Sequence, residues 1–313
     1  RFIIKVYTSI AHVFIELERN EDAWDVIQQM GHYINEWNDP INVRLLQSSD
    51  FYAAQLRAIP ERWDDGMQNV ISHAVLIFNQ CREHLTITPK DYHYVYCFCY
   101  LPNVISAFII DRMDYMNESK KGTLLPLAFE MLESLLRYSE IIEGYDPIEG
   151  MTSASQGYHN RGFLYYKLRR WNEAISDYQK ALDSRRFIYE YMPHKENKRV
   201  VGETLVNIGA AQLEWCKENH TVEGHNPIDT AKEALSIYES LYNKDYPLSE
   251  VDINKAKQLI ATSYYYIGNS EEKQLGLEIM KEIYAWVIDH KENSYMSSFL
   301  GNTVSILKME NLI

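Results

Sequence analysis

Hydrophobic and polar positions alternate with helical spacing along this chain, and an ordered set of small and large residues recurs in that pattern. The set is most regular between positions 158 and 181, where it comprises Tyr158, Gly162, Tyr165, Ala174, Tyr178 and Ala181. Small residues let two helices approach closely, and large residues fill the groove beside them. The pattern therefore predicts two short antiparallel helices that pack against each other.

Similar sets occur before and after this segment. In the first part of the chain, Tyr7, Ile10, Ala11 and Phe14 are followed by Ala23, Ile27 and Met30. Near the end, Ile260, Ala261 and Tyr264 are followed by Gly276, Met280 and Ile283. We expect helical units at roughly 4–37, 41–87, 92–143, 155–190, 200–243 and 253–290, with a further half unit at 294–313. Because the chain begins with Arg1 and ends within a unit, we expect it to be a fragment of a longer protein.

These ordered residues resemble the tetratricopeptide repeat, and the long, irregular units are similar to those of kinesin light chains and bacterial peptide-sensing regulators. The resemblance implies an all-α fold: a right-handed α-solenoid of antiparallel helical hairpins, with about six and a half repeats in a single domain over 1–313. Solenoids of stacked repeats present extended concave binding surfaces. The resemblance thus implies a protein-interaction scaffold.

The composition agrees with a helical protein and excludes several classes. Only 13 of the 313 residues are Gly and 9 are Pro, so turn-rich β architectures are disfavoured. No apolar run approaches the roughly 18–20 residues of a membrane helix, so we expect no membrane partner. A net charge of −13 disfavours nucleic acid as a partner. Within 156–199, however, ten Lys and Arg stand against five Asp and Glu, either as a solvated helix face or as a surface for an acidic partner.

The chain carries no recognisable catalytic or metal-binding motif. It has no glycine-rich phosphate loop, nucleophile elbow or His-Glu-x-x-His helix, which predicts a protein that is not an enzyme and needs no cofactor. His93, Cys97 and Cys99 lack a second ligand pair at zinc spacing, so no metal site is expected. The four cysteines do not form a disulfide framework, which favours a cytoplasmic location.

In the family that the chain resembles, the first helix of each hairpin lines a concave groove. The side chains expected in this groove are His159, Asn160, Phe163, Tyr166, Lys167, Asn207, Lys255, Gln258, Thr262, Tyr265 and Tyr266. Asn160 and Asn207 each precede a glycine by two residues and resemble the asparagines with which kinesin light chains clamp an extended peptide. An amide suits that role because it both donates and accepts hydrogen bonds. The same amides could instead bond a neighbouring helix or water.

Two functions follow from these observations. The first is a noncatalytic scaffold that binds a peptide or protein segment in the concave groove. The second is a ligand-sensing regulatory domain that controls an attached DNA-binding, kinase or protease domain. The variant of the family that binds carboxyl-terminal peptides through Lys and Asn is not matched, since His159 and Phe163 occupy those positions.

Overall fold

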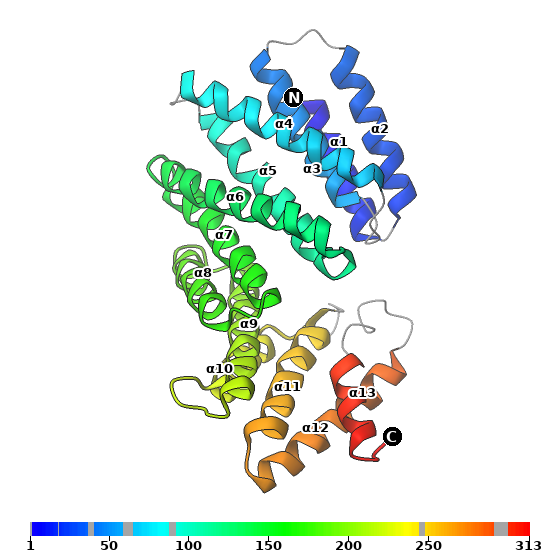
Figure 1. Ribbon diagram of the computed structural model, residues 1–313, viewed down its shortest axis with the longest axis vertical. Helices are drawn as coiled ribbons and strands as arrows, with labels where there is room; N and C mark the ends of the chain where they lie inside the picture. The colour runs from blue at the N-terminus through cyan, green and yellow to red at the C-terminus, as the bar shows by residue number, and fades with distance from the viewer. Residues whose placement is uncertain are drawn as a thin grey trace. The chain divides into compact units, whose positions relative to one another are not determined.

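The structure is a computed structural model that describes residues 2–17, 19–36, 41–58, 65–87, 92–243, 248–290 and 300–313. In these ranges every regular element is helical, with thirteen α-helices and one 3-10 helix (Figure 1). The chain forms two compact units, unit 1 from Arg1 to Leu164 and unit 2 from Tyr165 to Ile313.

Unit 1 contains the first six helices and most of the seventh. Their bounds are α1 (Phe2–Glu16), α2 (Asn20–Glu36), α3 (Ile41–Ala58), α4 (Asp65–Ile87), α5 (Tyr92–Asp111), the 3-10 helix η1 (Met113–Tyr115), α6 (Glu118–Glu143) and α7 (Pro147–Lys167). The residues of α7 from Tyr165 onward belong to unit 2. Unit 2 continues with α8 (Trp171–Tyr191), α9 (Lys195–Asn219), α10 (Pro227–Leu241), α11 (Leu248–Ile267), α12 (Ser270–Asp289) and α13 (Leu300–Met309).

Helices that follow each other in sequence also pack against each other. In unit 1, α3 contacts α1, α2, α4 and α5, and α5 also contacts α6. In unit 2, α9 contacts α8, α10 and α11, α11 also contacts α12, and α12 contacts α13. Alternate helices thus adjoin as well, so that α1, α3 and α5 form one row and α9 and α11 another. This arrangement confirms the predicted all-α solenoid, whereas its handedness and its division into repeat units stay predictions.

Small residues allow the close helix contacts, as the sequence pattern indicated. Ala11, Ala23 and Ile27 form a buried cluster with Ala54 and Ala58 in unit 1. Ile10, which the pattern assigned to the same packing, is instead exposed on α1. Ala11 lies on the face of α1 that meets α2 and α3, and the next residue along a helix points about 100° away.

In unit 2 the glycines approach specific neighbours. A Cβ atom on Gly209 would lie 2.8 Å from Cδ2 of Leu259 on α11, and one on Gly202 would lie 2.8 Å from Cε1 of Tyr238 on α10. Gly209 therefore makes room for the next odd-numbered helix. A Cβ atom on Gly209 would also lie 3.4 Å from the Pro227 backbone oxygen at the start of α10, but the closer approach to α10 is at Gly202, a residue that the sequence pattern did not mark.

The turn before α8 shows why the chain reverses there. Arg169 adopts a positive φ of 56°, and the backbone N–H of Arg170 donates to the carbonyl oxygen of Tyr165 at 2.9 Å. The Arg170 guanidinium lies 4.6 Å from the centre of the Tyr165 ring and also bonds Glu173 in the first turn of α8. Buried Trp171 then begins α8.

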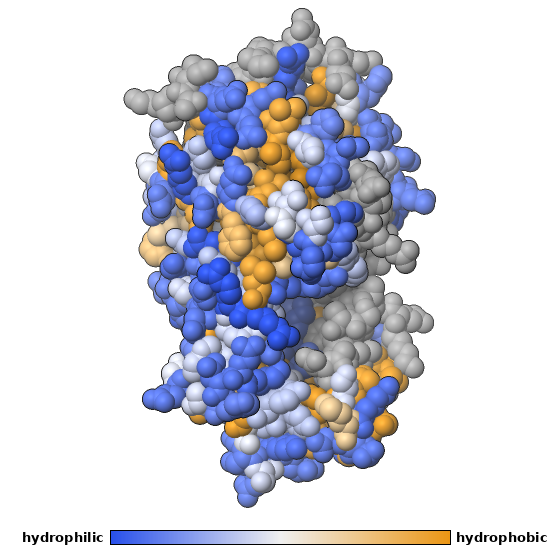
Figure 2. Space-filling view, viewed as in Figure 1, coloured by the Kyte–Doolittle hydropathy of each residue, from blue (hydrophilic) through white to orange (hydrophobic). Residues whose placement is uncertain are grey.

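Hydrophobic side chains also reach the surface of unit 1. On the face shown in Figure 2 they gather in a band that crosses α4 and α6. On α1, the exposed residues Val6, Ile10 and Val13 follow one another at steps of four and three, which places them on one side of the helix, and exposed Leu17 follows directly after its end.

The start of α12 offers a test of local stability. The side-chain oxygen of Asn269 accepts from the backbone N–H groups of Glu271 and Glu272, both at 3.0 Å, while the Glu272 carboxylate accepts from the Asn269 N–H at 2.8 Å. We expect Asn269→Ala to lower the free energy of unfolding by about 1 kcal/mol, because it leaves two backbone donors without this partner. Urea denaturation would measure the loss, and Asn269→Asp, which keeps the acceptor, should retain most of the stability.

Candidate functional site

Three tyrosines lie on odd-numbered helices of unit 2. The end of α7 supplies Tyr166, α11 supplies Tyr265 and Tyr266, and we call these three residues the tyrosine band. The Tyr166 ring meets Trp171 edge-on, with ring centres 5.2 Å apart, and the rings of Tyr265 and Tyr266 meet edge-on at 5.0 Å. The three tyrosines belong to the groove expected from the sequence.

Charged side chains lie between and beside these tyrosines. On α9 the Lys217 ammonium donates to Glu214 at 2.8 Å and lies 4.5 Å from the centre of the Tyr266 ring. The Tyr265 hydroxyl donates to the Glu310 carboxylate, beyond α13, at 2.7 Å, and Lys273 forms an ion pair with the same carboxylate at 3.3 Å. A cation over an aromatic face is an attractive arrangement. The band therefore combines apolar rings with paired charges.

The hydroxyl groups of Tyr166 and Tyr265 stay protonated at neutral pH. Burial, together with the negative charge of Glu214, raises the pKa of Tyr166 to about 12. The hydrogen bond to Glu310 and a smaller effect of burial raise the pKa of Tyr265 to about 12. The Tyr166 hydroxyl can thus donate a hydrogen bond, while that of Tyr265 already donates to Glu310. Tyr266 is 44% exposed and presents the largest open surface of the three.

The other expected groove residues of unit 2 differ in how much surface they offer. Lys255 is exposed, and Lys167 and Asn207 are half-buried. The Asn207 amide makes no hydrogen bond within the described part of the chain. The Gln258 amide donates to Thr303 of α13 at 2.8 Å, while Thr262 is buried and donates to the Gln258 carbonyl oxygen at 2.7 Å. Gln258 thus links α11 to α13, whereas the Thr262 hydroxyl bonds within α11.

In unit 1, the expected residues His159, Asn160 and Phe163 are all half-buried on α7. The Asn160 amide donates to the side-chain oxygen of Asn103 on α5 at 2.6 Å, and the Asn103 amide donates to Gln156 at 3.1 Å. This contact matches the alternative in which Asn160 bonds a neighbouring helix. The side-chain oxygen and the second N–H of the Asn160 amide can still form hydrogen bonds with a ligand.

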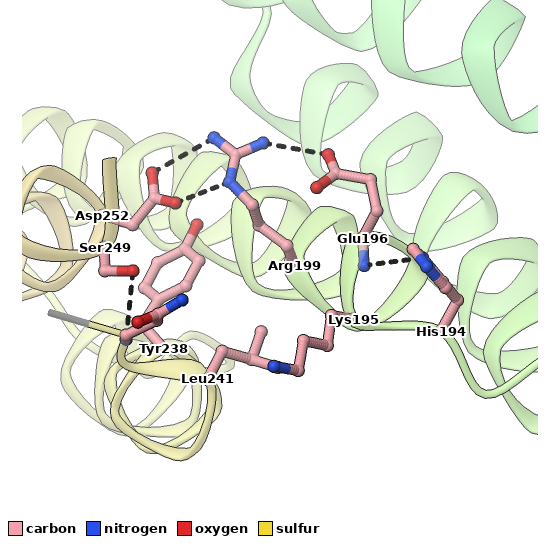
Figure 3. A pocket seen from close by; sticks show the side chains of 9 residues that line it. His194, Lys195, Glu196, Arg199, Tyr238, Leu241, Ser249 and Asp252 are labelled. Carbon is pink, nitrogen blue, oxygen red and sulfur yellow. Dashed lines mark hydrogen bonds and ion pairs between the residues drawn. The ribbon is translucent and has the colours of Figure 1, made fainter. Parts of the chain in front are cut away.

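A pocket that the sequence did not reveal lies where α9 and α11 begin and α10 ends (Figure 3). Arg199 on α9 bonds both oxygens of Asp252 on α11, through Nε at 2.6 Å and Nη2 at 3.3 Å, and bonds Glu196 through Nη1 at 3.2 Å. Burial opposes the Arg199 charge, but the bonds to Asp252 and the nearby carboxylates outweigh it and raise the pKa of Arg199. Arg199 and Asp252 are 53 residues apart, and no local pattern links them.

The structure gives no sign of metal chemistry in the part that it describes. No cluster of three or more His, Cys, Asp or Glu side chains there could hold a metal ion. The side chains of His93 and Cys97 lie outside the described residues, and burial raises the pKa of the Cys99 thiol to about 12. Among the described helices, none is both long and apolar enough to cross a membrane.

Comparison with known proteins identifies one repeat directly. Residues 155–185 match the tetratricopeptide repeat, whose members generally mediate protein–protein interactions and are typically noncatalytic. Neither the curated proteins nor the solved structures gave a match to the chain. The matched segment includes the 158–181 pattern from which the sequence predicted a helical hairpin. Residues 155–185 are thus identified as a tetratricopeptide repeat, and this repeat lies in a chain whose described helices pack in sequence order.

Proposed function

We propose that the odd-numbered helices of this chain bind a peptide or protein segment, and that the chain acts as a noncatalytic scaffold. The observation that carries this proposal is the tyrosine band of unit 2. Tyrosine combines a large apolar area with a polar tip and loses little rotamer entropy on binding, which is why it is enriched at interfaces. Exposed Tyr266 and the half-buried amide of Asn207 give such a surface both apolar area and backbone-bonding capacity.

An acidic partner fits the charges on the preceding segment. Arg169, Arg170, Lys180 and Arg186 are accessible, although each has a carboxylate of this chain within 4.0 Å. Exposed ion pairs contribute at most about 1 kcal/mol, so a partner's carboxylate can compete for these cations. We also propose a cytoplasmic location, which the free, buried thiols of Cys81, Cys99 and Cys216 support.

The test begins with peptides selected from a random display library against the whole chain. For such a peptide we expect Tyr266→Ala to weaken binding about tenfold, and Asn207→Ala to weaken it severalfold, as measured by fluorescence anisotropy. Tyr191→Ala is the matched control, because Tyr191 is exposed at the end of α8 and lies outside the band. All variants should keep the parent's thermal melting curve within a few degrees.

Unchanged affinity in both variants would refute binding through this surface. An equal loss with Tyr191→Ala would mean that the peptide recognises another face of unit 2. Selection of peptides rich in Asp and Glu would support an acidic partner, and selection of neutral or basic peptides would oppose it.

A further inference from the structure

The pocket at the start of α9 is separate from the tyrosine band and has the dimensions of a small-ligand site. Its volume is about 300 Å³, the lower end of the range for small-molecule sites. Its walls are His194, Lys195, Glu196, Arg199, Tyr238, Leu241, Asn243, Ser249 and Asp252. All of them belong to unit 2, so the pocket is complete within one compact unit.

Two buried hydroxyl groups at this pocket have unused donors. Tyr238 is 4% exposed, and its hydroxyl makes no hydrogen bond within the described part of the chain. Ser249 is 8% exposed; its oxygen accepts from the backbone N–H of Asn243 at 3.3 Å, but its own O–H has no acceptor among the described residues. Buried polar groups are nearly always hydrogen-bonded in native proteins. Both hydroxyl groups line the pocket, where their free O–H groups can donate to a ligand.

The acidic residues of the pocket are already engaged. Asp252 accepts two hydrogen bonds from Arg199, and Glu196 accepts a third. A guanidinium carries five N–H groups, so two of those on Arg199 are left over. Figure 3 shows the Tyr238 hydroxyl directed toward the Arg199–Asp252 pair. Both charges act on Tyr238: burial and the negative charge of Asp252 raise the pKa of its hydroxyl, and the positive charge of Arg199 opposes this rise.

Two further donors lie at the edge of the pocket. The Lys195 ammonium forms no ion pair with described residues, and its side chain runs toward Leu241 (Figure 3). The His194 ring accepts from the Glu196 N–H through Nδ1 at 3.3 Å, which leaves the proton of the neutral ring on Nε2. The N-terminus of α9 adds a partial positive charge at the same place.

The hydrogen-bonding groups left free in the pocket are thus mainly donors, while the formal charges of the pocket residues balance. Lys195 and Arg199 are offset by Glu196 and Asp252, so a singly charged anion suits the pocket better than a doubly charged phosphate. Leu241 and the ring of Tyr238 provide an apolar wall for the rest of the ligand. We propose that this pocket binds an organic carboxylate with a short aliphatic chain, either as a free acid or as the carboxyl end of a peptide.

The first experiment follows the Leu241 methyl resonances of the whole chain during titration with isovalerate. We expect saturable shifts with isovalerate and none with isovaleramide, which has the same shape without the charge. N-acetyl-leucine serves as the peptide-like acid. Tighter binding of N-acetyl-leucine assigns a peptide end, and tighter binding of isovalerate assigns a free acid; either result supports the proposal. Shifts of equal size with the amide, or binding of inorganic phosphate in preference to both acids, would overturn it.

Single-atom variants then test the donors. Tyr238→Phe removes a hydroxyl that makes no internal hydrogen bond, so the thermal melting temperature should hold while isovalerate binds about tenfold more weakly. Lys195→Gln should cause a similar loss. Glu196→Gln should tighten binding about threefold, because it removes a like charge. Lys281→Gln, at an exposed position of α12, is the control and should change nothing.

Undiminished isovalerate binding in both Tyr238→Phe and Lys195→Gln would refute the site. The proposed groove is judged separately, since none of these residues belongs to the tyrosine band. Loss of acid binding with intact peptide binding, or the reverse, would thus identify which of the two proposals fails.

Discussion

Replacing Gly276 with alanine is expected to destabilise the α11–α12 pair by about 3 kcal/mol. A Cβ atom at this position would lie 2.6 Å from the backbone oxygen of Ala261 and 3.1 Å from Cβ of Tyr264. A flexible side chain could move aside, but the backbone of α11 cannot do so without separating the helices. The cost therefore exceeds the gain of about 1 kcal/mol that alanine normally brings within a helix.

Gly122→Ala is the matched control for this substitution. Gly122 lies within α6, and a Cβ atom there would have no neighbour within 4 Å. We expect this variant to gain about 0.5–1 kcal/mol, because alanine has the better helix propensity. Amide hydrogen exchange in α11 and α12 would report the free energy of opening for Gly276→Ala, and that in α6 for Gly122→Ala. A gain at both positions would contradict the close approach of α11 and α12.

The second large effect is expected at the Arg199–Asp252 ion pair. The Asp252 side chain is 6% exposed and that of Arg199 is 23% exposed. Arg199→Met fills similar space but leaves the Asp252 carboxylate buried without its cation. Breaking such a pair from one side costs about 3–5 kcal/mol, and we expect a loss near 3 kcal/mol because Arg199 is partly accessible to water. Urea denaturation followed by circular dichroism would measure it.

A double variant separates the pair from the packing around it. Arg199→Met combined with Asp252→Leu removes both charges, and we expect it to recover most of the lost stability. Glu196→Gln should cost less than about 1 kcal/mol, since the Glu196 side chain is 57% exposed. If the double variant were no more stable than Arg199→Met, the loss would reflect packing rather than an unpaired charge.

The helical repeat was predictable because its signal is local. Ala174, Tyr178 and Ala181 lie on one face of a helix, and all three are buried. The same pattern marked Ala261 and Gly276 as small residues of one unit, and the structure shows a close approach between them. It misassigned Ile10, because a helical period of 3.6 residues does not show how wide the buried face of a particular helix is.

The groove residues were less predictable. The sequence predicted that Tyr264 packs inward and that Tyr265 and Tyr266 face the groove. Tyr264 is buried in the structure. It could not show that Gln258 donates to Thr303 or that Asn160 donates to Asn103, because those partners are 45 and 57 residues away. Helical spacing tells which side of its own helix a residue occupies and nothing about the next helix.

By itself, the sequence determined that the chain is helical, that small residues mark the close helix contacts, and that residues 155–185 contain a recognisable repeat. These properties depend on residues within one or two turns of each other, where spacing fixes geometry. Only the tertiary structure decided that Arg199 meets Asp252 and that the hydroxyls of Tyr238 and Ser249 share a pocket. Three helices must first assemble to bring those groups together, and the balance of burial and charge at such a junction is a property of the packed unit.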